Sequence, residues 1–299
     1  KLFVEVVEMG QGSHIKSIQS FADELECPIE YVTLVPNSNE FLPAGSSWGG
    51  GSQGTLRQMV SVQQLAKRFK KMWGEEDKGK YGGVTASDLK ISENSWNNMS
   101  KYEKVEATWK YRVDNNRDNL TAKYNNSEGT FADRSYVVCY MTSAEIELDI
   151  LTGKTNLLEV DVVFDVGKSG NPAIDMGQLE GGMIYGLGVA LSEERLYDEN
   201  HMLMTYDTST YKIPAIVDLP DKVKCKFLNN EPFEGDLPAK PCNEMGVLCG
   251  ASVFFGIKEA IRTSRKERGL STDFVLNLPA TPDRVIDALE LNNGDLNIA

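Results

Sequence analysis

The sequence predicts an α+β fold in which mixed sheets pack against helices. Residues 136–150 and 156–165 contain alternating apolar and polar side chains, and a Leu-Thr-Gly-Lys turn joins them as in a hairpin. Residues 174–191 and 246–266 are apolar over much of their surface, which is typical of buried helices. A further strand is expected at 223–228. Together these stretches indicate sheets covered by helices.

Composition narrows the possible functions. The chain has 299 residues, of which 41% are hydrophobic and 25% charged, so it is long enough for a large core or two domains. The net charge of −13 argues against a nucleic-acid partner or an anionic membrane surface. The five cysteines contain no Cys-x-x-Cys pair, which argues against an iron–sulfur or zinc site here and fits a reducing cytoplasm. No apolar stretch is long enough to cross a membrane.

The chain begins without Met and inside an expected strand at 2–7, so we expect a later piece of a longer protein. A glycine-rich turn then leads to a helix at 13–24, and a second strand is expected at 29–35. The turn contains Gly10, Gln11 and Gly12, and its backbone N–H groups could bind an anion or an amide-rich ligand. A tight turn without a ligand is the alternative.

A second glycine-rich segment precedes the next expected helix, at 55–72. Gly50, Gly51 and Ser52 would allow close approach of another backbone or a ligand, although a flexible connector has the same composition. Residues 74–130 are polar and predict surface elements, with a strand at 102–113. The two glycine segments are expected to converge on one cleft.

The expected helix at 174–191 contains five glycines, at 177, 181, 182, 186 and 188. Each would destabilise a surface helix by about 0.5–1 kcal/mol relative to alanine, so another backbone or a ligand must pack closely there. Gly177 and Gln178 repeat the Met-Gly-Gln order that ends at Gln11. Two such amides could hold one polar heterocycle, although so short a repeat also arises by chance.

The sequence around Glu244 places an acid at the start of an apolar helix. Asn243 is the expected N-cap, and Glu244 is expected in the first turn, facing the interior beside Cys242 and Met245. A buried acid is costly unless it has a partner or acts as a base, whereas favourable electrostatics at the helix N-terminus is the simpler interpretation. Two neighbouring apolar stripes indicate that the helix is buried at its start. One stripe comprises Leu248, Ala251 and Phe255, and the next comprises Val247, Gly250, Phe254, Ile257 and Ile261.

The C-terminal part of the chain carries weaker signals. A hairpin is expected around 198–200, a short strand at 273–278, and a last helix that begins with Thr281 as its cap. A basic run is expected to form the solvated end of the 246–266 helix rather than a binding patch; it comprises Arg262, Arg265, Lys266 and Arg268.

Several strings resemble the molybdenum hydroxylases, the family of aldehyde oxidases and xanthine dehydrogenases. The most specific is Asp-Val-Gly-x-x-x-Asn-Pro-Ala-Ile-Asp-x-Gly-Gln-x-Glu-Gly at 165–181. Glu-Met-Gly-Gln-Gly-x-His, Gly-Gly-Ser, Tyr-Lys-Ile-Pro-Ala, Lys-x-x-x-Glu and Ser-Val-Phe-Phe-x-Ile also match in order, at 8–14, 50–52, 211–215, 240–244 and 252–257. The similarity covers 1–73 and 131–289, and residues 246–270 look closer to animal aldehyde oxidases.

The resemblance implies that residues 1–299 are the C-terminal part of a molybdenum-cofactor-binding region, a molybdopterin-binding domain of the aldehyde oxidase/xanthine dehydrogenase type. Lobes at 1–75 and 130–299 would be joined by a surface segment at 76–129. It also implies domains absent from this chain: two [2Fe–2S] domains, an FAD domain and the upstream half of the molybdenum region. The family is homodimeric, so a cytoplasmic homodimer is expected.

The resemblance also implies roles for individual residues. Glu244 matches the general base of a hydroxylase that oxidises aldehydes or N-heterocycles with water as oxygen source. Three segments match positions that contact the cofactor in the family: Gly10–Gly12 with Gln11, Gly50–Ser52 with Gly51, and Gly177 with Gln178. No residue of this chain is expected to bind the metal directly. Asn243 stands where the family usually has glycine, and its side chain could intrude into the pocket. Purine oxidation of the xanthine dehydrogenase type and an inactive cofactor-binding relative remain alternatives.

Overall fold

The computed structural model describes residues 1–35, 50–73, 87, 90, 92–98, 138–228 and 239–291. The chain divides into two compact units. The first unit comprises 1–135 with 234–238, and the second comprises 136–233 with 239–299. The strand expected at 102–113 lies outside the described residues.

The first unit is mainly helical in its described part. Two short strands, β1 (Leu2–Phe3) and β2 (Leu34–Val35), pair in parallel. The predicted strands at 2–7 and 29–35 are therefore wrong over most of their length. Residues Ile29–Tyr31 form a 3-10 turn, η1, because Pro28 starts it and its carbonyl accepts from the Tyr31 N–H at 3.1 Å. The helices are α1 (Ser13–Leu25), α2 (Gly54–Trp73) and α3 (Glu93–Asn98), and the first two confirm the sequence prediction.

The carboxylate of Glu8 accepts hydrogen bonds from the N-terminus of α1. Glu8 accepts hydrogen bonds from the backbone N–H groups of Gly10, Gly12 and His14 at 2.9, 2.8 and 3.0 Å, and from the Ser13 hydroxyl at 3.1 Å. Desolvation raises the pKa of Glu8, but these four donors outweigh it and hold the pKa below its usual value. The N–H groups of Gly10, Gly12 and His14 therefore bond to Glu8, which favours the tight turn without a ligand at these three groups.

The second unit is built on a three-stranded mixed sheet in the order β3-β4-β5. Strands β3 (Tyr140–Leu148) and β4 (Thr155–Phe164) form the predicted antiparallel hairpin. Strand β5 (Lys222–Phe227) pairs in parallel with β4. Parallel and antiparallel pairing in one sheet, together with packed helices, confirms the α+β prediction.

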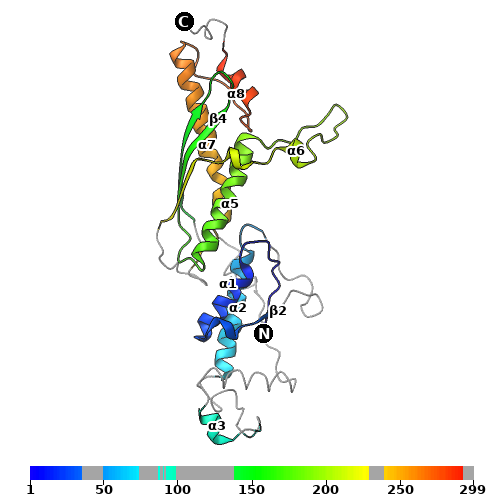
Figure 1. Ribbon diagram of the computed structural model, residues 1–299, viewed down its shortest axis with the longest axis vertical. Coiled ribbons are helices and arrows are strands. Elements are labelled where there is room, and N and C mark those ends of the chain that lie inside the picture. Colours follow the sequence, from blue (N-terminus) through cyan, green and yellow to red (C-terminus); the bar gives the residue numbers. More distant parts are fainter. Residues whose placement is uncertain are drawn as a thin grey trace. The chain divides into compact units, whose positions relative to one another are not determined.

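Two long helices cover this sheet, α5 (Pro172–Leu191) and α7 (Asn243–Glu267). Figure 1 shows them side by side, with α7 lying along β3 and β4. One apolar core joins the sheet to both helices. Its largest fully buried side chains include Phe164, Leu179, Met183, Leu187, Ile257 and Ile261.

Glycines set the contact between α5 and α7. A Cβ atom on Gly182 or Gly186 would overlap the carbonyl oxygen of Asn243 or Val247, respectively. From the other side, a Cβ on Gly246 or Gly250 would overlap backbone oxygens of α5. The expectation that another backbone packs closely on the α5 glycines is confirmed at Gly182 and Gly186.

Smaller elements complete the second unit. Tyr197 and Leu203 form an antiparallel bridge in the expected hairpin. The short elements are α6 (Thr208–Tyr211), η3 (Ile216–Asp218) and α8 (Pro282–Leu289). The strand predicted at 273–278 does not form. Phe274 instead packs its ring on the guanidinium of Arg265, 5.4 Å from the ring centroid.

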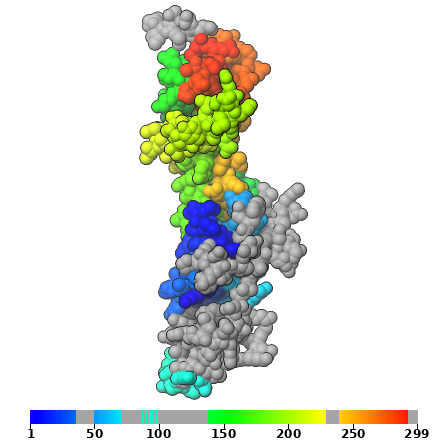
Figure 2. All heavy atoms as spheres, turned by 90° about the vertical axis from the view of Figure 1, so that its right-hand side faces the viewer, coloured from blue at the N-terminus to red at the C-terminus, as the bar shows by residue number. Residues whose placement is uncertain are grey.

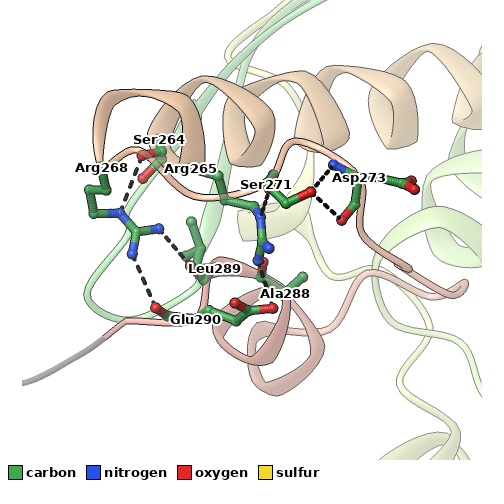
Figure 3. Close-up of polar contacts among 8 residues, drawn as sticks. All are labelled: Ser264, Arg265, Arg268, Ser271, Asp273, Ala288, Leu289 and Glu290. Atoms are coloured by element: carbon green, nitrogen blue, oxygen red, sulfur yellow. Dashed lines mark hydrogen bonds and ion pairs between the residues drawn. The ribbon is translucent and has the colours of Figure 1, made fainter.

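The end of α7 is tied to α8 by arginines. Arg265 is only 3% exposed, and it donates to the carbonyl oxygens of Ser271 at 2.6 Å and Ala288 at 2.7 Å. Arg268 donates to the carbonyl oxygens of Leu289 and Glu290 at 2.5 and 3.1 Å, as Figure 3 shows. The basic run is therefore not simply a solvated helix end, because two of its arginines cap α8. Figure 2 shows α8 (red) against this end of α7 (orange).

Replacing Gly186 by alanine should destabilise the α5–α7 contact by about 1–3 kcal/mol, because the new methyl group overlaps the Val247 carbonyl. Hydrogen–deuterium exchange of both helices should accelerate in the variant. Gly181→Ala is the matched control, since its Cβ meets nothing within 4 Å, and it should stabilise α5 by about 0.5–1 kcal/mol. Equal exchange in the two variants would contradict the close contact.

Replacing Glu8 by glutamine should destabilise α1 at neutral pH by on the order of 1 kcal/mol, as loss of a helix cap does. The pKa of Glu8 is depressed from 4.5 on folding, so its stabilisation is present above pH 4.5 and is lost as the pH falls through the folded value. The ratio of the α1 exchange rate in the variant to that in the native protein should therefore exceed one at pH 7. The ratio should approach one in acid. Glu30→Gln, on exposed η1, is the control for charge loss.

Candidate functional site

The candidate site of the second unit lies at the N-terminus of α7. Cys242 occupies the N-cap position, where its side chain makes no capping hydrogen bond to the helix, and Asn243 is the first helical residue. The Asn243 side-chain nitrogen donates to the backbone oxygen of Gln178 at 3.1 Å and to its side-chain oxygen at 3.3 Å. The prediction that Asn243 caps the helix is therefore wrong, because its amide reaches across to α5.

Glu244 lies in the first turn of α7, as predicted, but its side chain is exposed in this chain. The helix turns Met245 and Cys249 into the core and leaves Glu244 on the opposite face. Leu248 and Phe255 continue that face and are 51% and 64% exposed. The predicted burial of Glu244 and of this apolar stripe is wrong, because both faces of α7 are apolar and the described residues cover only one.

The loop before α7 is anchored to the loop before α5. Lys240 forms an ion pair with Asp165 at 2.5 Å, and its backbone N–H donates to the Val166 carbonyl at 2.8 Å. Burial raises the pKa of Asp165, but Lys240 and the Gly167 N–H hold it below its usual value. This ion pair fixes the entry of the chain into the turn that carries Glu244.

A buried acid that sequence reasoning did not assign lies beneath the site. Asp175 is 6% exposed and accepts from the Ser169 hydroxyl at 2.5 Å and from the Cys242 thiol at 3.6 Å. Asn171 caps α5 by accepting from the Ile174 N–H at 3.3 Å. The string Asn-Pro-x-x-Asp at 171–175 is the signal that could have placed this acid in the first turn. The Asp175 contact fixes Cys242, two residues before Glu244.

The outer face of α5 is open beside this network. A Cβ on Gly177 or Gly181 would meet no atom within 4 Å, so these two glycines do not serve the helix contact. Gln178 is partly exposed next to them. The structure thus groups Gly177 and Gln178 with Asn243, the residue before Glu244. A flat ligand could approach this backbone closely, and amide groups lie beside it.

In the first unit, Gln11 is bonded within its own loop. Its side-chain oxygen accepts from the Met9 N–H at 2.7 Å, and its nitrogen donates to the Val7 carbonyl at 2.8 Å. Gly10 and Gly12 have φ of 104° and 73°, and a Cβ on Gly10 would meet nothing within 4 Å. The loop therefore offers open backbone at Gly10, whereas the Gln11 amide holds the loop shape.

The second glycine segment of this unit is also a left-handed turn. Gly51 and Ser52 have φ of 61° and 56°, and the Gln53 N–H donates to the Gly50 carbonyl at 3.2 Å. A Cβ on Gly51 would meet nothing within 4 Å. These residues and those of the second unit belong to separate compact units, and their convergence on one cleft stays a prediction.

The described residues also bear on metal and membrane binding. All five cysteines are free thiols. Across the described part of the chain, no group of three or more His, Cys, Asp or Glu side chains could hold a metal ion. None of the helices in the described ranges is both long and apolar enough to span a bilayer.

Comparison with known proteins identifies relatives. Residues 1–220 match the family described as molybdopterin cofactor-binding domain. The chain is 33% identical over 290 residues to aldehyde oxidase 1 of Rattus norvegicus and 34% identical to aldehyde oxidase of Homo sapiens, with 95% of the chain aligned in each case. Xanthine dehydrogenase of Calliphora vicina is 32% identical over 93% of the chain. The chain spans 20% of the length of each of these relatives.

Solved structures share the fold. The Cu,Mo-CO dehydrogenase in its carbon monoxide reduced state superposes with a TM-score of 0.71 at 18% identity, over 97% of this chain and 36% of that chain. The aldehyde oxidoreductase of Desulfovibrio desulfuricans gives a TM-score of 0.66 at 20% identity, over 93% and 27% of the two chains. The chain therefore belongs to the molybdopterin cofactor-binding domain family, among molybdenum hydroxylases similar to aldehyde oxidases and xanthine dehydrogenases.

Proposed function

We propose that this chain is the cofactor-binding part of a molybdenum hydroxylase that oxidises aldehydes, N-heterocycles or both, with Glu244 as general base. The observation that carries the proposal is the exposed position of Glu244 in the first turn of α7, one residue after Asn243, whose side chain contacts Gln178. An acid there is accessible from outside the core.

The residues present fit a molybdenum–pyranopterin cofactor. Open backbone at Gly177, in the second unit, allows close approach of a flat ring system, and Gln178 offers an amide to its polar edge. In the first unit, the segments Gly10–Gly12 and Gly50–Ser52 would contact the same cofactor. When bound, the cofactor supplies the two-electron oxidation of the substrate carbon.

Glu244 moves the proton in this proposal. Its carboxylate accepts a proton from the water that provides the oxygen atom of the product, which makes that oxygen a better nucleophile. A base works best when water is excluded around it, because charges interact more strongly there. Leu248 and Phe255, 51% and 64% exposed on the same face, favour a cover of apolar surface from the upstream half of the molybdenum region.

Because this chain spans only 20% of the length of its relatives, we also propose which domains lie outside it. We expect two [2Fe–2S] clusters and FAD in domains outside this chain, a homodimer and a cytoplasmic location. Similarity to an insect xanthine dehydrogenase supports purine oxidation as a second candidate activity. The Asn243 side chain in the site motivates the other candidate, a cofactor-binding relative without turnover.

Replacing Glu244 by glutamine in the full-length protein should lower kcat by roughly 10²- to 10⁴-fold, because the amide cannot accept the proton. Molybdenum content should not change, since the substitution keeps the shape of the side chain. Turnover of aldehyde, N-heterocycle and purine substrates measures the effect and separates the two enzymatic candidates.

Glu259→Gln is the matched control, because Glu259 lies on an exposed face of α7 and pairs with Arg262. It should keep full activity. Undiminished turnover in the Glu244 variant would contradict the proposal that Glu244 is the general base. Absence of turnover with every substrate class in the native protein would favour the inactive relative.

A further inference from the structure

We propose that Asp175 is a positioning residue that acts through the Cys242 thiol to hold Glu244 in its outward direction at the start of α7. The inference rests on the proposed function, in that it needs Glu244 to act as the base. It gives a task to a buried acid and a thiol, neither of which the resemblance counts among the cofactor contacts or the catalytic groups.

The start of α7 is held from outside the helix. Cys242 occupies the N-cap position, but its side chain makes no capping hydrogen bond to the helix. The usual caps are serine, threonine, aspartate and asparagine, because their oxygen accepts from the first free N–H groups. Cys242 instead donates its thiol to Oδ1 of Asp175, at a distance of 3.6 Å. The contact joins the N-cap of α7 to the first turn of α5, 67 residues earlier in the sequence.

Asp175 is a fixed anchor for this thiol. It is 6% exposed, and its backbone N–H donates to the Asn171 carbonyl at 2.9 Å in the first turn of α5. The helix dipole favours a carboxylate at this end of a helix. The other oxygen, Oδ2, accepts from the Ser169 hydroxyl at 2.5 Å, which fixes the rotation of the carboxylate. Since the two oxygens accept from different side chains, Oδ1 stays directed toward Cys242.

The thiol contact and Glu244 lie on opposite sides of α7. Cys242 and Met245 are each 7% exposed, and residues three apart lie on the same side of a helix. Glu244 lies between them in the sequence and is exposed. A rotation of the first turn that released Cys242 from Asp175 would swing Glu244 about the helix axis by the same angle. The direction of Glu244 therefore depends on the contact of Cys242 with Asp175.

This contact is suited to fixing a direction rather than to stabilising the fold. A thiol is a weak hydrogen-bond donor, so its loss should leave the protein folded. A general base, in contrast, must lie within hydrogen-bond reach of the proton that it accepts, and a misplacement of about 1 Å can lower a rate by about 100-fold. A small movement of the turn is therefore expected to lower kcat more than the melting temperature.

Cys242→Ala in the full-length protein removes the donor, and Cys249→Ala is its matched control. Cys249 is 0% exposed on the same helix, but its thiol donates within α7, to the Met245 carbonyl at 3.8 Å. We expect Cys242→Ala to lower kcat by roughly 10- to 100-fold at unchanged KM and molybdenum content. Backbone amide exchange at 243–246 should rise several-fold in this variant alone. Equal losses in the two variants would mean that a cavity is the cause and would overturn the inference.

Cys242→Ser tests whether the side chain acts through Asp175. The hydroxyl is also a donor, so kcat and the exchange rate should return to native values. Serine at an N-cap can also cap the helix by itself, so serine and alanine at 242 are compared again with Asp175→Ala. There the two should behave alike, and a persisting advantage of serine would overturn the inference. The Cys242 and Cys249 variants keep Asp175, so they decide the matter even where Asp175→Ala fails to fold.

The exchange measurement separates this inference from the proposed function, because it requires no turnover. Native turnover in Glu244→Gln, together with faster exchange in Cys242→Ala alone, would leave the contact standing and overturn Glu244 as the base. Unchanged exchange in Cys242→Ala, together with lost turnover in Glu244→Gln, would overturn the inference and leave the proposed function standing.

Discussion

The close contact between α5 and α7 is the constraint on which the site depends. Glycines on both helices bring backbone against backbone, so that the carbonyl of Asn243 lies where a Cβ of Gly182 would be. Only at this separation can a side chain as short as asparagine reach the Gln178 backbone across the contact. The glycines thus weaken helix propensity but make possible the polar contact beside Glu244.

The rest of the second unit holds the two ends of α7 by different chemistry. At its N-terminus, Lys240 pairs with Asp165 and Cys242 contacts Asp175, which fixes the turn before Glu244. At its C-terminus, Arg265 and Arg268 satisfy the last carbonyl groups of α8. Between these ends the helix is packed on the sheet, so the acid in its first turn is displayed from a rigid support.

The sequence was sufficient for the long helices and for the hairpin, because their apolar periodicity is strong and local. It failed where the outcome depends on a distant partner. Strands at 2–7 and 29–35 shrink to β1 and β2, since only their ends pair. Glu244 was expected inside because α7 is apolar on two faces, and no local pattern tells which face the chain covers. Asn243 bonds to Gln178 instead of capping its helix, and this contact joins residues that lie 65 positions apart in the sequence.

We propose that these residues display an amide and an acid toward a molybdenum–pyranopterin cofactor. The most direct measurement is the molybdenum and iron content of the native full-length protein by elemental mass spectrometry. We expect one molybdenum per chain, together with about four irons, as two [2Fe–2S] clusters require. Iron without molybdenum would contradict it, because the open glycines and the Gln178 amide would then have no cofactor to hold.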